Sequence, residues 1–455
     1  MTASAKRTDK TVRAVASEIL FKVDRNKAYA DILLDETLRT NPFDDRDRAL
    51  LTELIYGTLR WRGVIDARLI RLMRRPLAKA DPFIRNLLRL TLYQIIFLDK
   101  IPAYAAVNEA VELAKLRGAR AASFVNGVLR NFLRDDEKDG NPAPQDRIAT
   151  ALAEKLSHPE WLVARWLADF GVEEATSLMR ANNDRAPLVV RVNSLKCGRE
   201  ELLARFREGG IDARPTHSSP QGISVVSGAT VAALPGFAEG LFQVQGEASQ
   251  LVTYLLGPQP GERVLDACAA PGGKSTHIAE MMRDSGNVIA LDPSARGIDR
   301  IQENAARLQL RSVQAVRGDA SRRLDGACDG PFERILVDAP CSGLGTLRSH
   351  PEIKWQRGQG DIRRLSQLQS KILANVAAHL KPGGVLVYST CTLLKDENDG
   401  VVEGFLCKQG GFELEDVAGY LPEGTRYLTR HNYFQTLPHR DNMDGFFAAR
   451  MRKVS

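Results

Sequence analysis

Two kinds of apolar periodicity follow one another along the chain, and their order is what most limits its fold. Up to residue 134, apolar residues recur at three- and four-residue steps, as in TVRAVASEILFKVD (11–24), which is typical of helices packed in a bundle. From residue 188 onward, short apolar runs typical of strands alternate with helical segments. Strands that alternate with helices form parallel sheets covered on both faces. The two patterns need different folds, so we predict a multidomain chain.

The changes of pattern predict four parts. The first is an all-α bundle. The second is a linker containing DDEKDGNPAP (135–144) and a helical connector, in which Ser157 and Glu160 fit a capping box. The third is a small α/β unit, and the fourth is an α/β domain with a parallel sheet. The predicted boundaries are 1–135, 136–185, 186–240 and 241–455.

The formal charge is concentrated in the predicted bundle. Residues 1–135 contain 25 Lys and Arg against 16 Asp and Glu, a balance of +9, whereas the rest of the chain has a balance of −2. A basic domain beside a near-neutral one suits a partner rich in phosphate, because backbone charge supplies much of the affinity for nucleic acids. A solvated helical surface would have the same composition, so charge alone does not decide between the two.

Several classes of protein are excluded by composition. No apolar run approaches the ~20 residues that a membrane span needs, and the polar start MTASAKRTDK lacks a signal-peptide core, so we expect a cytoplasmic protein with no membrane partner. The six cysteines form no CxxC pair and no zinc-like cluster with histidine, so we expect no metal and no disulfide framework. Nothing indicates self-association, and we expect a monomer.

The segment LDACAAPGGKST (265–276) follows a predicted strand and opens a predicted helix. A P-loop would need glycine where Cys268 stands, and a dinucleotide fingerprint needs a third glycine besides Gly272 and Gly273. The third interpretation is the loop of a class I (Rossmann-like) methyltransferase, whose small residues let the backbone approach S-adenosylmethionine closely. We therefore predict S-adenosylmethionine as the cofactor.

Acidic residues at successive strand ends favour this third interpretation. The acids lie at the ends of the first two strands, after the third and at the end of the fourth: Asp266, Asp292, Asp319 and Asp338. An acid in the second position can accept hydrogen bonds from ribose hydroxyls, and Asp319 could accept one from the adenine amino group. Any single acid is a weak signal, but four in series at one sheet edge predict a binding site.

Two cysteines also lie just past predicted strands, in DAPCSG (338–343) and YSTCT (388–392). Methylation of carbon 5 of a pyrimidine needs a nucleophile, because that carbon has no lone pair: a thiolate adds to carbon 6 and turns carbon 5 into an enamine-like nucleophile. A pair of inert buried thiols is the plain alternative. The thiol chemistry by itself does not choose between Cys341 and Cys391 as the nucleophile.

The motifs together carry a family resemblance. FQVQGEASQ (242–250), LDACAAPGGK, DAPCSGLGTLR, KPGG with YSTCT, and DGFFAARM resemble the RNA 5-methylcytosine methyltransferases over about residues 185–455. The first 135 residues resemble the RNA-binding factor NusB in RDRALLTELIYGTLRWRGVID, IPAYAAVNEAVELAK and SFVNGVLRNFL. The combination is similar to the bacterial enzymes that methylate cytosine carbon 5 in small-subunit (16S) ribosomal RNA.

The resemblance implies residue roles and partners. Cys391 matches the nucleophile, and Cys341 matches the cysteine that assists product release. Asp338 is implied to border the cofactor and to hold the N3 edge of cytosine, and the 186–240 unit is implied to be a ferredoxin-like RNA-positioning module. The remaining positions implied to hold or border S-adenosylmethionine are Cys268, Ala269, Ala270, Pro271, Gly272, Gly273, Lys274, Asp292 and Asp319. For Lys274, a solvated position at the helix start is the alternative.

The implied substrate is ribosomal RNA, bare or at an early stage of assembly, because the target base must leave its stack. Two other functions stay open. A methyltransferase acting on an exocyclic base nitrogen would carry Asp/Asn-Pro-Pro with an aromatic residue, where this chain has Asp-Ala-Pro-Cys. A non-enzymatic NusB-like RNA-binding factor would not need the intact loop, acids and cysteines.

Overall fold

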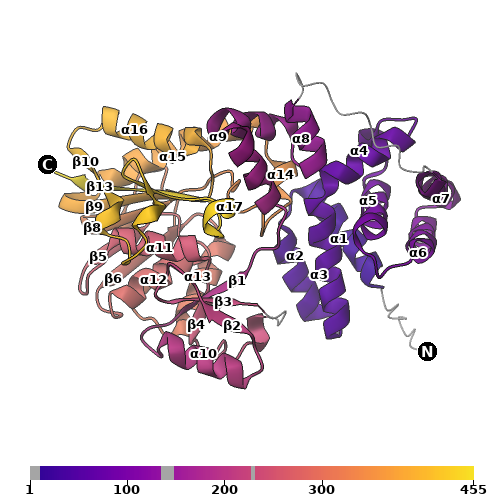
Figure 1. Cartoon of the computed structure of the whole chain (residues 1–455). Coiled ribbons are helices and arrows are strands. Elements are labelled where there is room, and N and C mark those ends of the chain that lie inside the picture. The colour runs from indigo at the N-terminus through magenta and orange to yellow at the C-terminus, as the bar shows by residue number, and fades with distance from the viewer. Residues whose placement is uncertain (1–10, 42, 135–147, 227–230, 455) are drawn as a thin grey trace. The chain divides into compact units, whose positions relative to one another are not determined.

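The computed structural model describes residues 11–41, 43–134, 148–226 and 231–454 (Figure 1). They fall into two compact units. The helical unit comprises the chain up to Asp184 together with Leu347–Gln356, and the sheet unit comprises Arg185–Thr346 and Arg357–Ser455. The predicted connector is therefore part of the helical unit, and the 186–240 module is part of the sheet unit.

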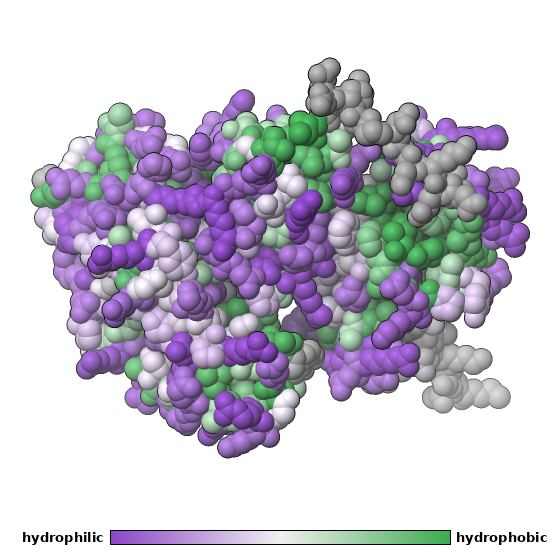
Figure 2. Space-filling view, viewed as in Figure 1, coloured by the Kyte–Doolittle hydropathy of each residue, from purple (hydrophilic) through white to green (hydrophobic). Residues whose placement is uncertain are grey.

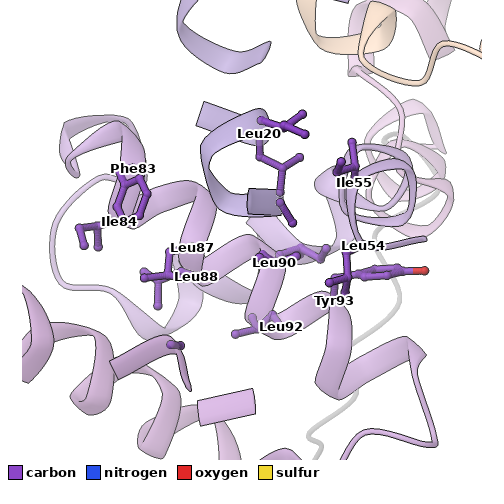
Figure 3. Packing of buried hydrophobic residues seen from close by; sticks show 14 of the residues in the cluster. Leu20, Leu54, Ile55, Phe83, Ile84, Leu87, Leu88, Leu90, Leu92 and Tyr93 are labelled. Atoms are coloured by element: carbon purple, nitrogen blue, oxygen red, sulfur yellow. The ribbon is translucent and has the colours of Figure 1, made fainter. Parts of the chain in front are cut away.

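The helical unit consists of amphipathic helices around one apolar core. Helix α5 begins at Pro82, where the Asp81 carboxylate accepts hydrogen bonds from the backbone N–H groups of Phe83 and Ile84. Helices α1, α3 and α5 contribute Leu20, Leu54 and Leu88 to the core, each at most 1% exposed (Figure 3). The helices are α1 (Val12–Asn26), α2 (Ala30–Thr40), α3 (Asp45–Arg60), α4 (Arg62–Leu72), α5 (Pro82–Phe97), α6 (Ala103–Lys115), α7 (Ala119–Arg134), α8 (Ile148–Leu156) and α9 (Glu160–Ala181).

The capping box predicted at Ser157 and Glu160 is wrong. Helix α9 begins at Glu160 with Pro159 as its N-cap, which provides no side-chain hydrogen bond. Ser157 lies in the turn after α8 with φ +56°. Its hydroxyl donates to the carbonyl of Arg60 at 2.8 Å and accepts from the N–H of Gly63 at 2.9 Å. The serine thus joins this turn to the α3–α4 junction, a long-range contact that the local motif does not reveal.

A short segment from the second half of the chain, Leu347–Gln356, completes the helical unit. It contains the helix α14 (Ile353–Gln356), in which Lys354 is fully buried. The Lys354 ammonium donates to Asn183 Oδ1 at 2.7 Å and to the carbonyls of Ser157 and Arg60 at 3.2 and 3.4 Å. Trp355 donates its indole N–H to the carbonyl of Leu59 at 2.9 Å. The predicted boundaries included this segment in the 241–455 domain.

The surface of the helical unit is mixed in polarity. Figure 2 shows hydrophobic side chains around α6. Tyr104 in this helix and Leu116, which follows it, are 76% and 77% exposed. Basic residues are exposed in the segment that follows α4, at Arg74, Arg75 and Lys79. None of the described helices, in either unit, combines the length and the apolar character that a membrane span requires.

The sheet unit contains a small antiparallel sheet near its start. Its strands, in the order β2-β3-β1-β4 among the described residues, pack against α10 (Arg199–Glu208) through Phe206, which is fully buried. The strands are β1 (Leu188–Val192), β2 (Ala213–Pro215), β3 (Gly222–Val225) and β4 (Phe242–Val244). Strand β4 belongs to this sheet although its residues lie beyond the predicted boundary at 240, because Val192 pairs with Phe242.

The larger sheet carries the predicted site. Its order is β11-β12-β13-β9-β8-β5-β6-β7, with β10 also paired to β13. Strands β5 to β9 are parallel, as predicted, and the remaining pairs are antiparallel. The strands are β5 (Arg263–Asp266), β6 (Asn287–Asp292), β7 (Val313–Arg317), β8 (Phe332–Asp338), β9 (Leu380–Thr390), β10 (Phe412–Glu415), β11 (Thr429–Arg430), β12 (Tyr433–Thr436) and β13 (Phe446–Lys453).

Helices connect the parallel strands and pack on the sheet, whose two faces belong to two separate apolar cores. The first core includes Ile335 and Leu373, and the second includes Leu255 and Leu336, all fully buried. The helices are α11 (Glu247–Leu256), α12 (Gly273–Met281), α13 (Ala295–Leu308), α15 (Gln359–Ala377), α16 (Asp399–Lys408) and α17 (Pro438–Asp441). The carboxyl ends of the parallel strands share one edge, where sites of open α/β sheets lie.

Replacing Lys354 by methionine should destabilise the helical unit. The change removes the donor of three hydrogen bonds and leaves buried acceptors without a partner, which should lower the free energy of unfolding by about 3 kcal/mol. All four tryptophans lie in the helical unit, so urea denaturation followed by tryptophan fluorescence measures it selectively. The exposed Lys155→Met variant is the control and should change stability by less than about 0.5 kcal/mol. Equal midpoints for K354M and the native chain would contradict this role.

Candidate functional site

The glycine-rich loop between β5 and α12 has the tight geometry that its small residues predict. Gly272 has φ +97°, and a Cβ atom there would lie 3.1 Å from the Cα of Ile301, so the position favours glycine for both conformation and space. Asn304 donates to the carbonyl of Pro271 at 2.9 Å and holds the loop against α13. The loop therefore presents its backbone at the carboxyl edge of the sheet.

The four predicted acids lie around this loop. Burial raises the pKa of the Cys268 thiol well above its usual range, and the charges of these four carboxylates raise it further. Asp292 accepts hydrogen bonds from the N–H groups of Ala270 at 3.2 Å and Ser294 at 2.9 Å. A ring of carboxylates suits a ligand that carries positive charge, as the sulfonium and amino groups of S-adenosylmethionine do.

Asp266 and Asp319 lie in contrasting environments within this ring. Burial raises the pKa of Asp266 to about 7, although Ser275 donates a hydrogen bond to its Oδ2 at 2.7 Å. The other oxygen, Oδ1, is buried and accepts no hydrogen bond from the described residues. Asp319 is half-exposed, and hydrogen bonds from Ser321 lower its pKa. The buried oxygen of Asp266 fits an amino donor of the cofactor, so the residues present are compatible with S-adenosylmethionine.

Lys274 is not a solvated lysine at a helix start, as the alternative interpretation held. It is 8% exposed, its ammonium lies 2.6 Å from Asp338 Oδ2, and it lies 5.2 Å from the ring centroid of Phe446. Asp338 also accepts from the Ser389 hydroxyl at 2.8 Å. The cation and the carboxylate form a partly buried pair at the edge of the sheet, beside the cysteines.

The two cysteines, fifty residues apart in sequence, meet at this edge. Their strands β8 and β9 pair in parallel with Asp338 opposite Ser389, so the loops that follow both strands emerge together. The sulfur atoms of Cys341 and Cys391 are 3.3 Å apart. The hydrogen bond with Cys391, burial, and the nearby carboxylate of Glu397 raise the pKa of Cys341 well above its usual range. The two thiols share a hydrogen bond in which either sulfur can be the donor.

A fully buried ion pair supports the glycine-rich loop from the small sheet. Arg191, on β1, lies 2.7 Å from Glu280 Oε1 on α12, and both side chains are fully buried. The guanidinium also donates to the carbonyl of Gly273 at 2.8 Å and to Thr276 Oγ1 at 3.1 Å. No sequence pattern indicates this role of Arg191, because its partners on α12 lie about 80 to 90 residues away along the chain. Glu397 was also missed, although DEN (396–398) shortly after YSTCT is an unusual run of polar residues for a segment that proves to be largely buried.

Comparison with known proteins gives consistent matches for all parts of the chain. A family model for 16S rRNA methyltransferase RsmB/F matches residues 253–452, the NusB family model matches 10–134, and an RsmF/B-like ferredoxin-like domain matches 158–232. The chain is 41% identical to "Probable ribosomal RNA small subunit methyltransferase B" of Bacillus subtilis, over 97% of this chain and 99% of that one. These matches confirm the predicted fold class.

Solved structures agree with these matches. The crystal structure of PH0851 superposes with a TM-score of 0.84 at 26% identity and covers 98% of both chains. NSun6 from Pyrococcus horikoshii, solved with the S-adenosylmethionine analogue SFG, superposes with a TM-score of 0.59 at 25% identity, over 65% of this chain and 98% of that one. The similarity to NSun6 supports S-adenosylmethionine as the methyl donor.

The raised pKa of Asp266 predicts a dependence of stability on pH. Between the unfolded pKa of 3.8 and the folded pKa of about 7, the folded state binds the extra proton, so stability falls as pH rises through this window, by at most about 4 kcal/mol. Asp266→Asn removes the charge and this dependence. The variant should exceed the native chain in stability at about pH 8 and match it near pH 4.

Urea denaturation followed by circular dichroism, compared with tryptophan fluorescence to identify the transition of the sheet unit, measures the effect of Asp266→Asn. The exposed Asp299→Asn variant on α13 is the control and should follow the native chain at both pH values. A difference between D266N and the native chain that does not depend on pH would mean that Asp266 is charged in the folded state.

Proposed function

The chain belongs to the RsmB/F family of 16S rRNA methyltransferases and is an S-adenosylmethionine-dependent RNA methyltransferase, and we propose that it methylates carbon 5 of a cytosine through a covalent cysteine adduct. The observation that carries this proposal is the approach of the Cys341 and Cys391 sulfur atoms to 3.3 Å at the cofactor edge of the sheet. Methylation of a base nitrogen uses the lone pair of that nitrogen and needs no thiol. A pair of thiols beside the cofactor loop suits a carbon that must first be activated.

Cys391 is the proposed nucleophile. Only a thiolate adds to carbon 6 at a useful rate, and Cys341 is held in the protonated form by the bond to Cys391, by burial and by Glu397. A thiol that donates to a neighbouring sulfur stabilises negative charge on that neighbour. The match of Cys391 to the nucleophile of the family motif chooses between the two sulfurs, and the contact between them is compatible with that choice.

The Lys274–Asp338 pair is placed to hold the target base. Addition of Cys391 to carbon 6 moves electron density toward N3 and O2 of the cytosine, and the ammonium of Lys274 can stabilise that charge. Asp338 is proposed to hold the N3 edge of the cytosine by accepting a hydrogen bond from the exocyclic amino group on that edge, as its oxygens already accept from Lys274 and Ser389. S-adenosylmethionine would supply an electrophilic methyl group, which would pass to the activated carbon 5 as its bond to the sulfonium sulfur breaks and S-adenosylhomocysteine leaves.

Cys341 is proposed to assist release of the product. Once the Cys391 sulfur is bonded to carbon 6, it no longer carries the charge that favoured a protonated Cys341, which removes the largest cause of the raised pKa. Cys341 can then assist removal of the proton from carbon 5. The electron pair of that C–H bond forms the C5=C6 double bond, and the C6–S bond breaks with its pair returning to Cys391.

For the substrate, we propose small-subunit ribosomal RNA that is bare or early in assembly. The target base must leave its stack, at a cost of a few kcal/mol that is lowest in unpaired RNA. The helical unit supports RNA binding by its balance of +9 over residues 1–135 and by the exposed Arg74, Arg75 and Lys79, whose charges suit phosphate contacts. Phosphate contacts hold the RNA, and the sheet unit selects the base.

Cysteine variants test the mechanism. Cys391→Ala should abolish both methyl transfer and adduct formation, whereas Cys341→Ala should accumulate an RNA–protein adduct that survives a denaturing gel, because addition still occurs but release fails. The measurements are incorporation of labelled methyl groups from S-adenosylmethionine into bare ribosomal RNA and gel analysis of the products.

Cys328→Ala is the matched control, since that thiol is 3% exposed and lies in the core beneath the sheet rather than at its edge. It should leave transfer and release close to those of the native chain. Adducts with C391A and none with C341A would mean that the two roles are exchanged, and no incorporation into any RNA by the native chain would remove the proposed activity.

A further inference from the structure

A buried carboxylate, Glu397, contacts the loop that carries Cys341 and lies in the turn that follows Cys391. It ends the 3₁₀ turn Lys395–Glu397, six residues after Cys391, and is fully buried. Its Oε1 accepts the backbone N–H of Ser342 at 2.8 Å and the side-chain amide of Gln369 at 2.9 Å. Burying a carboxylate is costly even when it is hydrogen-bonded, so a buried glutamate at this place calls for a specific explanation.

The contacts of Glu397 reach the residues on both sides of Cys341. Ser342 follows the cysteine and donates its backbone N–H directly to the carboxylate. Pro340 precedes the cysteine, and its carbonyl accepts from the same Gln369 amide group at 3.0 Å. Because both neighbours are tied to the Glu397–Gln369 pair, the backbone that carries Cys341 has little freedom to move.

The same network reaches the residues on both sides of Cys391. The hydroxyl of Thr392 lies 2.8 Å from that of Ser342. Asn398, next to Glu397, accepts from the Thr390 hydroxyl at 2.6 Å and donates to the carbonyl of Thr392 at 3.0 Å. The turn that contains Glu397 and Asn398 thus joins the two loops that bear the thiols.

We propose that Glu397 is a positioning residue that sets the separation of Cys341 and Cys391 and is needed for release of the methylated product. The inference rests on the proposed function. Addition of Cys391 to carbon 6 needs one sulfur, whereas release needs Cys341 to act while Cys391 departs. A network that fixes one sulfur relative to the other therefore matters most in the release step.

This assignment predicts a particular failure. Glu397→Ala removes the acceptor shared by Ser342 and Gln369, so Cys341 can move away from its place. Methyl transfer in the first turnover should persist, turnover should fall about a hundredfold, and an RNA–protein adduct should accumulate as with C341A. Glu397→Gln keeps an acceptor oxygen of the same reach, so it should partly restore turnover relative to E397A and reduce the adduct.

The experiment measures, with the full chain, bare ribosomal RNA and labelled S-adenosylmethionine, the first-turnover methyl yield, the steady-state rate and the adduct on a denaturing gel. Glu403→Ala, an exposed glutamate on α16, is the matched control and should form no adduct above the native level. Gln369→Met is a second variant that leaves the carboxylate in place but removes its donor. It should accumulate adduct in the same way and tests the network should E397A fail to fold.

The outcomes separate this inference from the proposed function. If C341A accumulates adduct while folded E397A and Q369M do not, the positioning role of Glu397 is wrong and the proposed function stands. If E397A loses first-turnover transfer and adduct together while E397Q does not restore release, Glu397 has a general structural role and the inference is overturned. If C341A accumulates no adduct, the covalent mechanism itself fails.

Discussion

Parallel pairing between β8 and β9 is the constraint on which the chemistry of this protein depends. The register places Asp338 opposite Ser389, so two loops fifty residues apart in sequence leave the sheet side by side. The sulfur atoms of Cys341 and Cys391 are brought to 3.3 Å, and Asp338 takes its place between Lys274 and Ser389. A shift of this register by one residue would turn the side chains of one strand to the opposite face and separate these groups.

A second constraint joins the small sheet to the cofactor loop. Arg191 and Glu280 are both withdrawn from water, and loss of either partner would leave an uncompensated buried charge at a cost of about 3–5 kcal/mol. The same guanidinium holds the carbonyl of Gly273, next to Lys274. The small sheet is thereby connected, through one side chain, to the glycine-rich loop that carries Lys274.

Some features of the site follow from local physics and were predictable. Gly272 is needed for its positive φ and for its close approach to Ile301, and the acids and cysteines end strands whose apolar runs are evident in the sequence. Other features depend on partners far away along the chain. No local pattern marks Lys354 as buried, the motif at Ser157 predicted a helix cap, and β4 lies past the predicted domain boundary. The structure places all three by contacts between distant segments.

The sequence by itself determined the order of elements, the loop chemistry and the residue types at each strand end, because helix and strand periods and glycine conformations are local properties. The family motifs also distinguished Cys391 from Cys341, which the thiol chemistry did not. Only the tertiary structure decided that the two sulfurs share a hydrogen bond, that Lys274 is paired rather than solvated, and that Glu397 lies behind both cysteines. Such relations arise from strand register and burial, which depend on how distant segments pack.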